Sequence, residues 1–348
     1  MKQVLYFHIG LSSFVEKDIA ILKEEFELLI FHFQVKNKKQ VPFSFFKQFF
    51  FILKNFFKSD IFVIQFGGYQ SLIPCLFSKL FKKKKSVIIL GGTDCVSLPS
   101  IKYGNFSKRL LTFATEISLK TASLLLPVDE SLIEYKYEYQ DNDFPYQGYQ
   151  YFIKNIQTPK KVIYNGYDGE LWKCTKEKEP LSFITVGANL GSRFGFQLKG
   201  IDLIFEVAPD FPDCKFYIVG GNSIKNKVIP SNIILLNPVP NESLAEFISS
   251  KQYYLQLSMS EGFPNALCEA MLCECIPIVS SVGAMPKIVG EDGYILKKKS
   301  ILELKSILVK AIGNNSKHDT IKVRNRIINN FQLSLRKNQL LKVINSLD

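Results

Sequence analysis

Two glutamates flank a short turn in the stretch SEGFPNALCE, which covers residues 260–269. Glu261 precedes the Gly-Phe-Pro turn, and Glu269 follows eight residues later inside an otherwise apolar helical pattern. Eight residues of helix rotate a side chain by about 80°. The two carboxylates therefore need not share a face, and each can contact a different part of one ligand.

The turn between the glutamates is typical of a helix that begins at a ligand. Gly262 allows backbone shapes that other residues resist, and Pro264 suits the first turn of a helix. The preceding run YYLQLSMS predicts a strand whose carboxyl end points into a cleft. A helix from Asn265 to Cys273 would direct its N-terminal amides and partial positive charge into that cleft, which suits a phosphate.

The elements that must position this turn alternate between strand and helix along the chain. The apolar runs VLYFHIG, ELLIFHFQV, DIFVIQFGG, SVIILGG and SLLLPVDE predict buried strands with helices between them. This alternation predicts an α/β fold with parallel, doubly wound sheets. It lapses near residues 165–180 and restarts, so we expect two Rossmann-like domains, 1–165 and 166–330, facing across a cleft. A C-terminal helix is expected over 331–348, with a return to the N-terminal domain as one option.

Composition narrows the class of protein. The 348 residues carry a net charge of +12 and 47% hydrophobic residues, which is globular. No apolar run reaches the roughly 18 residues that span a bilayer, and the N-terminus lacks signal-peptide features. Seven scattered cysteines fit a reducing compartment, so we expect a cytoplasmic protein, with a peripheral position on the inner face of the cell membrane as an alternative.

The motifs resemble the retaining glycosyltransferases of family four, or glycosyltransferase group 1, which have the GT-B fold of two facing Rossmann-like domains. The two-glutamate motif appears as EGFPNALCE, and VIYNGYDGELW resembles the Asn-Gly-x-Asp at the start of the second domain. ITVGANLGSRFGFQLKGIDLIFEVA resembles the segment with a basic phosphate-binding pair, and FYIVGGN the strand and loop near the nucleotide. The resemblance covers the second domain well and the first in outline.

The resemblance implies a role for each matching residue. Glu261 would contact the donor sugar near the reacting carbon, and Glu269 would accept hydrogen bonds from the ribose hydroxyls. Lys199, with Arg193 as companion, would neutralise the leaving diphosphate, whose developing negative charge cations and helix-end amides stabilise. The remaining donor-binding candidates form the turn and the helix start, where every backbone amide from Phe263 to Leu267 except that of Pro264 would contribute: Gly262, Phe263, Pro264, Asn265, Ala266 and Leu267.

Three positions depart from the family pattern. Arg193 stands six residues after Gly187, whereas the family Arg follows its Gly directly. Many members carry a His where IILGGTD offers Asp94, which we keep as a catalytic candidate beside Glu261, with a helix cap as the alternative. Gly10 stands alone where members often have two glycines, so it is either a donor contact or part of a tight turn.

The family resemblance implies transfer of a sugar from a nucleotide diphosphate sugar with retained configuration. The expected acceptor is a glycan or a lipid-linked molecule in cell-surface polysaccharide or lipopolysaccharide biosynthesis. No cofactor, metal or nucleic acid is expected. The alternatives are a nucleotide-sugar epimerase or hydrolase of the same fold, and a non-catalytic partner subunit.

A phenylalanine-rich segment, VPFSFFKQFFFILKNFFKS, covers residues 41–59. At about 100° per residue its Phe side chains fill a wide arc, and Lys47, Lys54, Lys58, Ser44, Gln48 and Asn55 lie on the opposite arc. The segment therefore predicts either a helix packed on the first sheet through its apolar arc, or a helix at an anionic membrane surface. The lysine run Lys82–Lys85 would add attraction in the second case.

Overall fold

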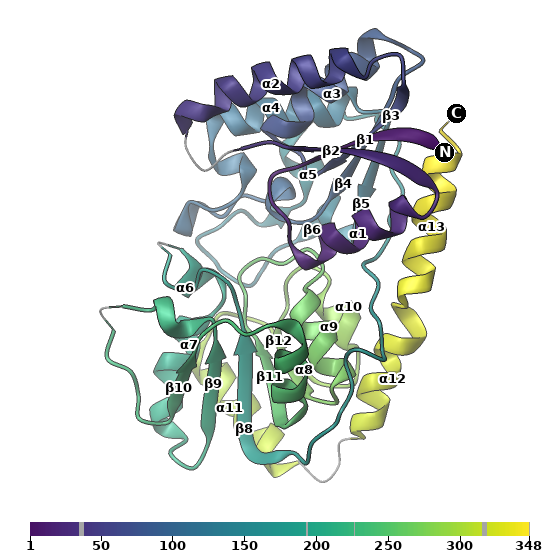
Figure 1. Ribbon diagram of the computed structural model, residues 1–348. Helices are drawn as coiled ribbons and strands as arrows, with labels where there is room; N and C mark the ends of the chain where they lie inside the picture. Colours follow the sequence, from purple (N-terminus) through teal and green to yellow (C-terminus); the bar gives the residue numbers. More distant parts are fainter. Residues whose placement is uncertain (35–37, 193, 226, 315–318, 348) are drawn as a thin grey trace.

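The computed structural model describes residues 1–348 except 35–37, 193, 226, 315–318 and 348. Two parallel sheets lie one above the other (Figure 1). The first has the strand order β2-β1-β3-β4-β5 and the second β10-β9-β8-β11-β12-β13. The alternation of apolar runs and helical patterns thus correctly predicts the fold class.

The first sheet and its helices come from the first part of the chain. Its strands are β1 (Lys2–His8), β2 (Phe26–His32), β3 (Ser59–Gln65), β4 (Lys85–Leu90) and β5 (Leu124–Pro127). Its helices are α1 (Ser13–Lys23), α2 (Val41–Lys54), α3 (Tyr69–Leu80) and α4 (Arg109–Thr121). The inner strands β1, β3 and β4 are nearly continuous apolar runs because both faces are covered, and Val4–Phe7 of β1 are fully buried.

A short segment then leads to the second sheet. It holds β6 (Tyr135–Lys136), β7 (Tyr146–Gln147) and the short helix α5 (Tyr149–Phe152). The second sheet's strands are β8 (Glu179–Val186), β9 (Lys215–Val219), β10 (Ile233–Leu236), β11 (Lys251–Gln256), β12 (Ile276–Ser280) and β13 (Tyr294–Leu296). Its helices are α6 (Gly195–Leu198), α7 (Ile201–Val207), α8 (Asn241–Ser249), α9 (Asn265–Leu272), α10 (Met285–Val289), α11 (Ile301–Gly313) and α12 (Thr320–Asn330).

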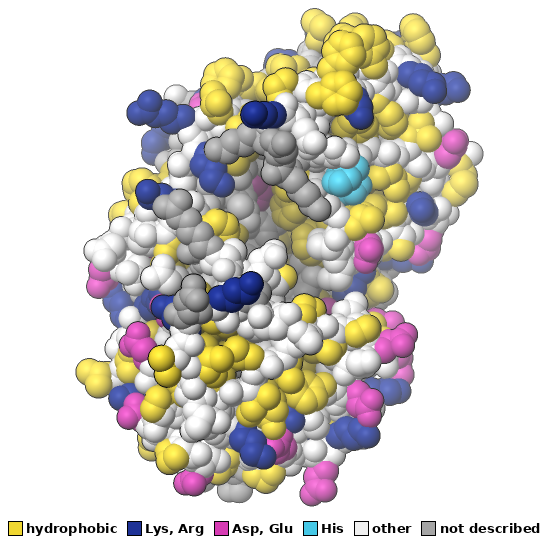
Figure 2. Space-filling view, turned by 60° about the vertical axis from the view of Figure 1, so that its left-hand side comes forward, with side chains coloured by type: hydrophobic (Ala, Val, Ile, Leu, Met, Phe, Trp, Pro, Cys, Tyr) yellow, Lys and Arg dark blue, Asp and Glu magenta, His cyan; other side chains and the backbone are white. Residues whose placement is uncertain are grey.

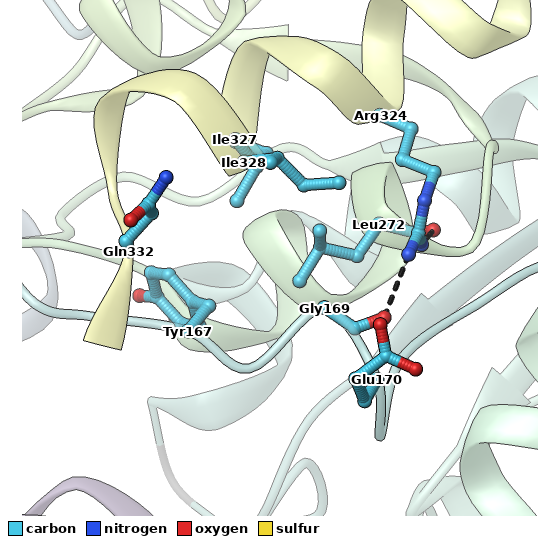
Figure 3. Close-up of a pocket in the computed structure, with 8 residues that line it drawn as sticks. All are labelled: Tyr167, Gly169, Glu170, Leu272, Arg324, Ile327, Ile328 and Gln332. Carbon is cyan, nitrogen blue, oxygen red and sulfur yellow. Dashed lines mark hydrogen bonds between the residues drawn. The ribbon is translucent and has the colours of Figure 1, made fainter. Parts of the chain in front are cut away.

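The chain passes between the two sheets twice, and the two passages run side by side. Tyr167 N–H donates to the Phe331 carbonyl at 2.9 Å, and Leu333 N–H donates to the Tyr167 carbonyl at 3.1 Å. A pocket of about 210 Å³ lies beside them, lined by Tyr167, Arg324 and Gln332 among others (Figure 3). Arg324 closes its far side by donating to the Gly169 carbonyl at 2.6 Å. The pocket lies beside the two segments that connect the sheets, next to Leu272 at the end of α9, and not at the start of α9.

The last helix, α13 (Leu333–Asn345), returns to the first sheet's side of the molecule (Figure 1). Arg336 forms a two-point ion pair with Asp18 of α1, with both N–O distances 2.7 Å and both side chains buried. Arg336 also donates to the carbonyls of Ile163 and Tyr164. This buried charge is therefore fully paired, as a buried guanidinium requires.

Helix α2 does not pack on the protein through its Phe arc, which was one of the two alternatives for this segment. It buries the opposite face. Ser44, Gln48 and Ile52 are its buried residues, whereas most of its phenylalanines are exposed. The polar side chains go inward because they find hydrogen-bond partners there: Gln48 Nε2 donates to the Gln70 carbonyl at 2.7 Å, and Ser44 Oγ to the Gln34 carbonyl at 3.1 Å. Within the described residues, no helix is long and apolar enough to cross a membrane.

Candidate active site

Glu261 and Lys199 meet at the carboxyl end of the second sheet. Lys199 follows α6, Glu261 follows β11, and Lys199 Nζ lies 2.6 Å from Glu261 Oε1. Gln256, the last residue of β11, donates a second hydrogen bond to Glu261 Oε1 at 2.9 Å. Burial alone would lower the pKa of Lys199, but the Glu261 carboxylate outweighs it and raises that pKa. The lysine therefore stays cationic in the cleft.

Hydrogen bonds connect the turn from Gly262 to Asn265 with the first segment between the two sheets. Asn165 Nδ2 lies 3.4 Å from both the Phe263 carbonyl and Asn265 Oδ1, and Tyr167 donates to Asn265 Oδ1 at 2.8 Å. The Phe263 ring packs on Tyr164 and Phe331, with ring centroids 5.8 and 5.1 Å away. Pro264 is the N-cap of α9, and Ala266 and Leu267 form its first turn with Asn265. The Asn-Gly-Tyr-Asp motif thus holds the start of α9 in place.

The same turn contacts the first sheet's loops across the cleft. Asn265 Nδ2 lies 3.2 Å from Ser13 Oγ, the first residue of α1, so the N-termini of α1 and α9 face each other. A Cβ at Gly262 would lie 2.1 Å from the Gly91 carbonyl oxygen. Only glycine fits at this position, and the surface is hollowed between the two domains (Figure 2).

Glu269 lies one turn further along α9 and is 8% exposed. Burial raises the pKa of its carboxyl group to about 7, while the charge of Lys17 on α1 opposes the rise. The Lys17 ammonium itself lies 4.9 Å from the Tyr167 ring centroid. A carboxylate held in so apolar a place is a candidate for ligand binding, because a plain core helix would not retain it.

Asp94 is buried between its own loop and the loop after β3. Its Oδ2 accepts from Gly67 N–H at 2.9 Å, and its Oδ1 from the amides of Gly91 and Gly92 at 3.2 and 2.9 Å. Burial raises the pKa of this carboxyl group, against the effect of those amides. Asp94 thus shapes the glycine loop that faces Gly262. It is not a helix cap, because the N-cap of its short 3-10 helix, Thr93–Cys95, is Gly92.

Gly10 and Gly187 are the remaining predicted positions that the structure describes. Gly10 is exposed after β1, with nothing within 4 Å of where a Cβ would be. Gly187 follows β8, and its carbonyl oxygen would lie 1.9 Å from a Cβ at Gly220, so two loop backbones touch there. Arg193 lies outside the described residues.

Tyr103 and Gln256 lie near the Lys199–Glu261 ion pair, but neither belongs to a sequence motif that would have predicted this position. Tyr103 donates or accepts a 2.6 Å hydrogen bond with Thr93, its ring lies 5.7 Å from that of Phe194, and burial raises its pKa. Gln256 follows the consecutive apolar residues Tyr253–Leu255 in β11 and is buried like them, and a polar residue at this place in a buried strand is the signal that could have identified it. Among the described residues, no group of three His, Cys, Asp or Glu is arranged to hold a metal ion.

Part of the chain matches a known protein family. Residues 191–332 match the family model of glycosyl transferases group 1. One relative, a component of the Arabidopsis thaliana phosphatidylinositol N-acetylglucosaminyltransferase, is 25% identical over 175 residues, 46% of this chain and 38% of that protein. An uncharacterized glycosyltransferase of Methanocaldococcus jannaschii is 25% identical over 271 residues, 71% of this chain and 64% of that protein. The matched region thus spans less than two thirds of either relative.

Solved structures share the fold over the whole chain. Sucrose-phosphate synthase from Thermosynechococcus elongatus superposes with a TM-score of 0.78 at 12% identity, covering 100% of this chain and 99% of that one. Anabaena HepE in complex with UDP and glucose gives 0.70 at 14% identity, covering 99% and 100%. The GT-B fold is therefore confirmed. The comparisons thus show a GT-B fold over the whole chain and a match to glycosyl transferases group 1 over residues 191–332.

Proposed function

We propose that the protein transfers a sugar from a nucleotide diphosphate sugar to a glycan or lipid-linked acceptor with retained configuration. The observation that carries the proposal is the Lys199–Glu261 pair, at 2.6 Å, beside the N-terminus of α9. A diphosphate placed there would meet the Lys199 ammonium and the free amides of the first turn of α9. Both groups stabilise the negative charge that develops as the diphosphate leaves.

The two glutamates divide the donor between them. Glu261, in the loop after β11, would contact the sugar near the reacting carbon, and Glu269, inside α9, would accept hydrogen bonds from the ribose. A fold neighbour supports this class of donor, since structures of Anabaena HepE hold UDP and UDP-glucose at 14% identity to this chain. Donor binding would replace the contact between Lys199 and Glu261 with one between Lys199 and phosphate.

Retention follows if the acceptor attacks from the face that the diphosphate leaves. The bond between the anomeric carbon and the phosphate oxygen breaks, and a bond from that carbon to the acceptor oxygen forms. The acceptor's proton passes to the departing phosphate oxygen. Lys199 supports the step by stabilising the phosphate, so the proposal requires no metal or further cofactor.

The acceptor side is the first sheet, whose loops face α9. We infer a lipid-linked acceptor in the synthesis of a cell-surface polysaccharide or lipopolysaccharide, at the cytoplasmic face of a membrane. The names of the curated relatives, phosphatidylinositol N-acetylglucosaminyltransferases from plant, yeast and human, support a lipid-borne acceptor at 22–28% identity.

The test is a panel of nucleotide sugars, with and without candidate lipid-linked acceptors, read as released nucleoside diphosphate and as the anomeric configuration of the product by NMR. The proposal expects acceptor-dependent release, a retained configuration, and loss of both in Lys199→Ala. Epimerised donor without release would instead indicate a nucleotide-sugar epimerase, and acceptor-independent release a hydrolase. No binding to any donor would indicate a non-catalytic subunit.

A further inference from the structure

An apolar surface covers one side of the first domain, outside the candidate site. Its side chains are 39–96% exposed and lie on α2, α3 and α4 or at their ends. We call this surface the aromatic face, and its members are Phe43, Phe46, Phe49, Phe50, Leu53, Phe57, Leu76, Leu80, Phe81, Leu110 and Phe113. Figure 2 shows hydrophobic side chains gathered at the top of the molecule, where Figure 1 places α2.

The aromatic face is continuous from helix to helix. Phe50 contacts Phe46 and Phe49, with ring centroids 4.6 and 5.6 Å apart. Phe49 in turn lies 5.7 Å from Phe77 of α3, and α3 packs against α4. Contiguous apolar surface of this kind marks an interaction site rather than a scatter of single exposed residues.

A hydrogen bond on the inner side of α2 holds the helix in the orientation that exposes its phenylalanines. Rotating the helix would bury the phenylalanines, but it would break the hydrogen bond from the buried Gln48 to the Gln70 carbonyl. Asn55 is also buried, and it donates to the Phe51 carbonyl at 2.8 Å. The helix therefore directs the uncharged Ser44 and Gln48 into the protein and most of its phenylalanines outward, whereas an ordinary surface helix buries its apolar side.

Positive charge is concentrated in the same part of the chain. Residues 28–115 hold 14 Lys and Arg and two Asp, an excess equal to the +12 of all 348 residues. Asp94 is buried in its loop, and Asp60 pairs with the buried Lys84 at 2.7 Å. Exposed basic residues lie on the helices and ends that form the aromatic face: Lys47, Lys54, Lys58, Lys79, Lys82, Lys83, Lys108 and Arg109.

We propose that the aromatic face docks onto an anionic lipid bilayer, with the phenylalanine rings among the headgroups and the surrounding lysines on lipid phosphates. Exposed rings beside cations suit this interface: Lys47 Nζ lies 4.5 Å from the Phe43 ring centroid, so one patch offers apolar surface and charge together. An anionic lipid surface offers partners for the apolar side chains and for the lysines. Nucleic acid would leave the leucines of the aromatic face without apolar contacts.

Docking in this way would also bring the membrane close to the cleft. Leu110 and Phe113 lie on α4, and the loop before α4 carries Tyr103, whose hydroxyl bonds to Thr93 beside the glycine loop at Gly262. A lipid-borne acceptor could then reach the cleft without leaving the bilayer. This last consequence depends on the proposed transfer activity, but the docking itself does not.

The charge test must avoid Lys84, because its ammonium is buried against Asp60 and the Ser59 carbonyl. Changing all of Lys82–Lys85 would therefore damage the fold. Lys82→Gln/Lys83→Gln changes only exposed residues, and Lys310→Gln/Lys342→Gln, in the exposed faces of α11 and α13, is the matched control for net charge. For the apolar surface, Phe46→Ser/Phe50→Ser/Phe57→Ser is compared with Leu302→Ser/Val309→Ser on α11.

The experiment is flotation of the full chain with phosphatidylcholine vesicles, with and without about one third phosphatidylglycerol, in low and high salt and without any substrate. We expect salt-sensitive binding to the anionic vesicles only, about 30-fold weaker in Lys82→Gln/Lys83→Gln at about 1 kcal/mol per charge, and lost in the Phe variant. Both control variants should bind like the wild type. In Phe57→Trp, the emission should shift to the blue on binding.

Three results would overturn the proposal: equal binding to neutral and anionic vesicles, no binding at low salt, or undiminished binding of the Phe variant. A concentration-dependent dimer that the Phe variant abolishes, without vesicle binding, would assign the aromatic face to a second copy of the chain. Because no substrate is present, any of these outcomes leaves the proposed glycosyl transfer standing.

Discussion

Helices α9 and α2 both mix apolar and polar side chains, yet they bury them for different reasons. In α9, Glu269 is buried at a free-energy cost that appears as a pKa raised to about 7. In α2, Gln48 is buried with its amide on the Gln70 carbonyl, and the phenylalanines are left outside. A buried carboxyl group that the protein itself does not neutralise points to a ligand. A buried amide that bonds to a neighbouring element points to architecture, as Gln48 does through Nε2, although its Oε1 has no partner among the described residues.

The largest expected effect is at the ion pair beside α9. Lys199→Ala should lower the rate of sugar transfer by a factor on the order of 100 or more, because a preorganised cation is removed from the leaving group. Steady-state kinetics with the donor identified in the panel measures this. The control is Lys310→Ala on the exposed face of α11, which should transfer normally. Near-normal kinetics in Lys199→Ala would remove this residue from the site.

Glu261→Ala should reduce turnover more than donor affinity, since this carboxylate would lie near the reacting carbon. Lys199 would also lose the partner that lies 2.6 Å away, so the variant's fold is checked by circular dichroism. The measurement is kcat and KM for the donor in both proteins. A rise in KM at constant kcat would assign Glu261 to ground-state binding instead.

Glu269 should make the protein less stable as the pH rises. Its folded-state pKa of about 7 exceeds the ordinary value of 4.5, so between these values the folded protein keeps a proton that the unfolded chain has released. Its contribution is therefore present below pH 4.5 and is lost as the pH rises through 7. Glu269→Gln should raise the free energy of unfolding at pH 8 by on the order of 3 kcal/mol.

The stability measurement is denaturant unfolding of Glu269→Gln and wild type at several pH values. The gain should shrink steadily toward pH 4.5. The same substitution should weaken donor binding, at a cost of about 1–3 kcal/mol, because an amide accepts fewer ribose hydrogen bonds than a carboxylate. A variant that is destabilised at pH 8 would mean that Glu269 supports the fold rather than the ligand.

The smallest effect is expected for a substitution in α2, which should lower the stability of the protein, whereas Glu269→Gln should raise it. Gln48→Met keeps the volume but leaves the Gln70 carbonyl without its buried donor, so it should destabilise the protein by about 1–2 kcal/mol at every pH. Thermal unfolding measures this, with Phe57→Ser as the control. The Phe57 ring is 96% exposed, so its loss should leave the stability unchanged. Stabilisation by Gln48→Met would show that the outward orientation of the phenylalanines is not held by this bond.

The two helices also differ in how far the sequence could predict them. Apolar runs and the Glu261–Glu269 spacing predicted the sheets and the turn at α9, because local patterns determine local structure. The buried face of α2 depends on Gln70, on a different element, and no periodicity within α2 reveals it. The pairing of Arg336 with Asp18 joins residues 318 positions apart, and Tyr103 reaches the cleft through a loop without a motif.

The central claim is that Lys199 and the start of α9 hold the diphosphate of a donor. Isothermal titration of wild type and Lys199→Met with uridine, guanosine and adenosine diphosphates tests it most directly, since it requires neither the sugar nor the acceptor. We predict that wild type binds at least one of the three and that Lys199→Met binds it at least about tenfold more weakly, which is a loss of about 1.4 kcal/mol. Equal binding by both proteins, or no binding by wild type, would contradict the claim.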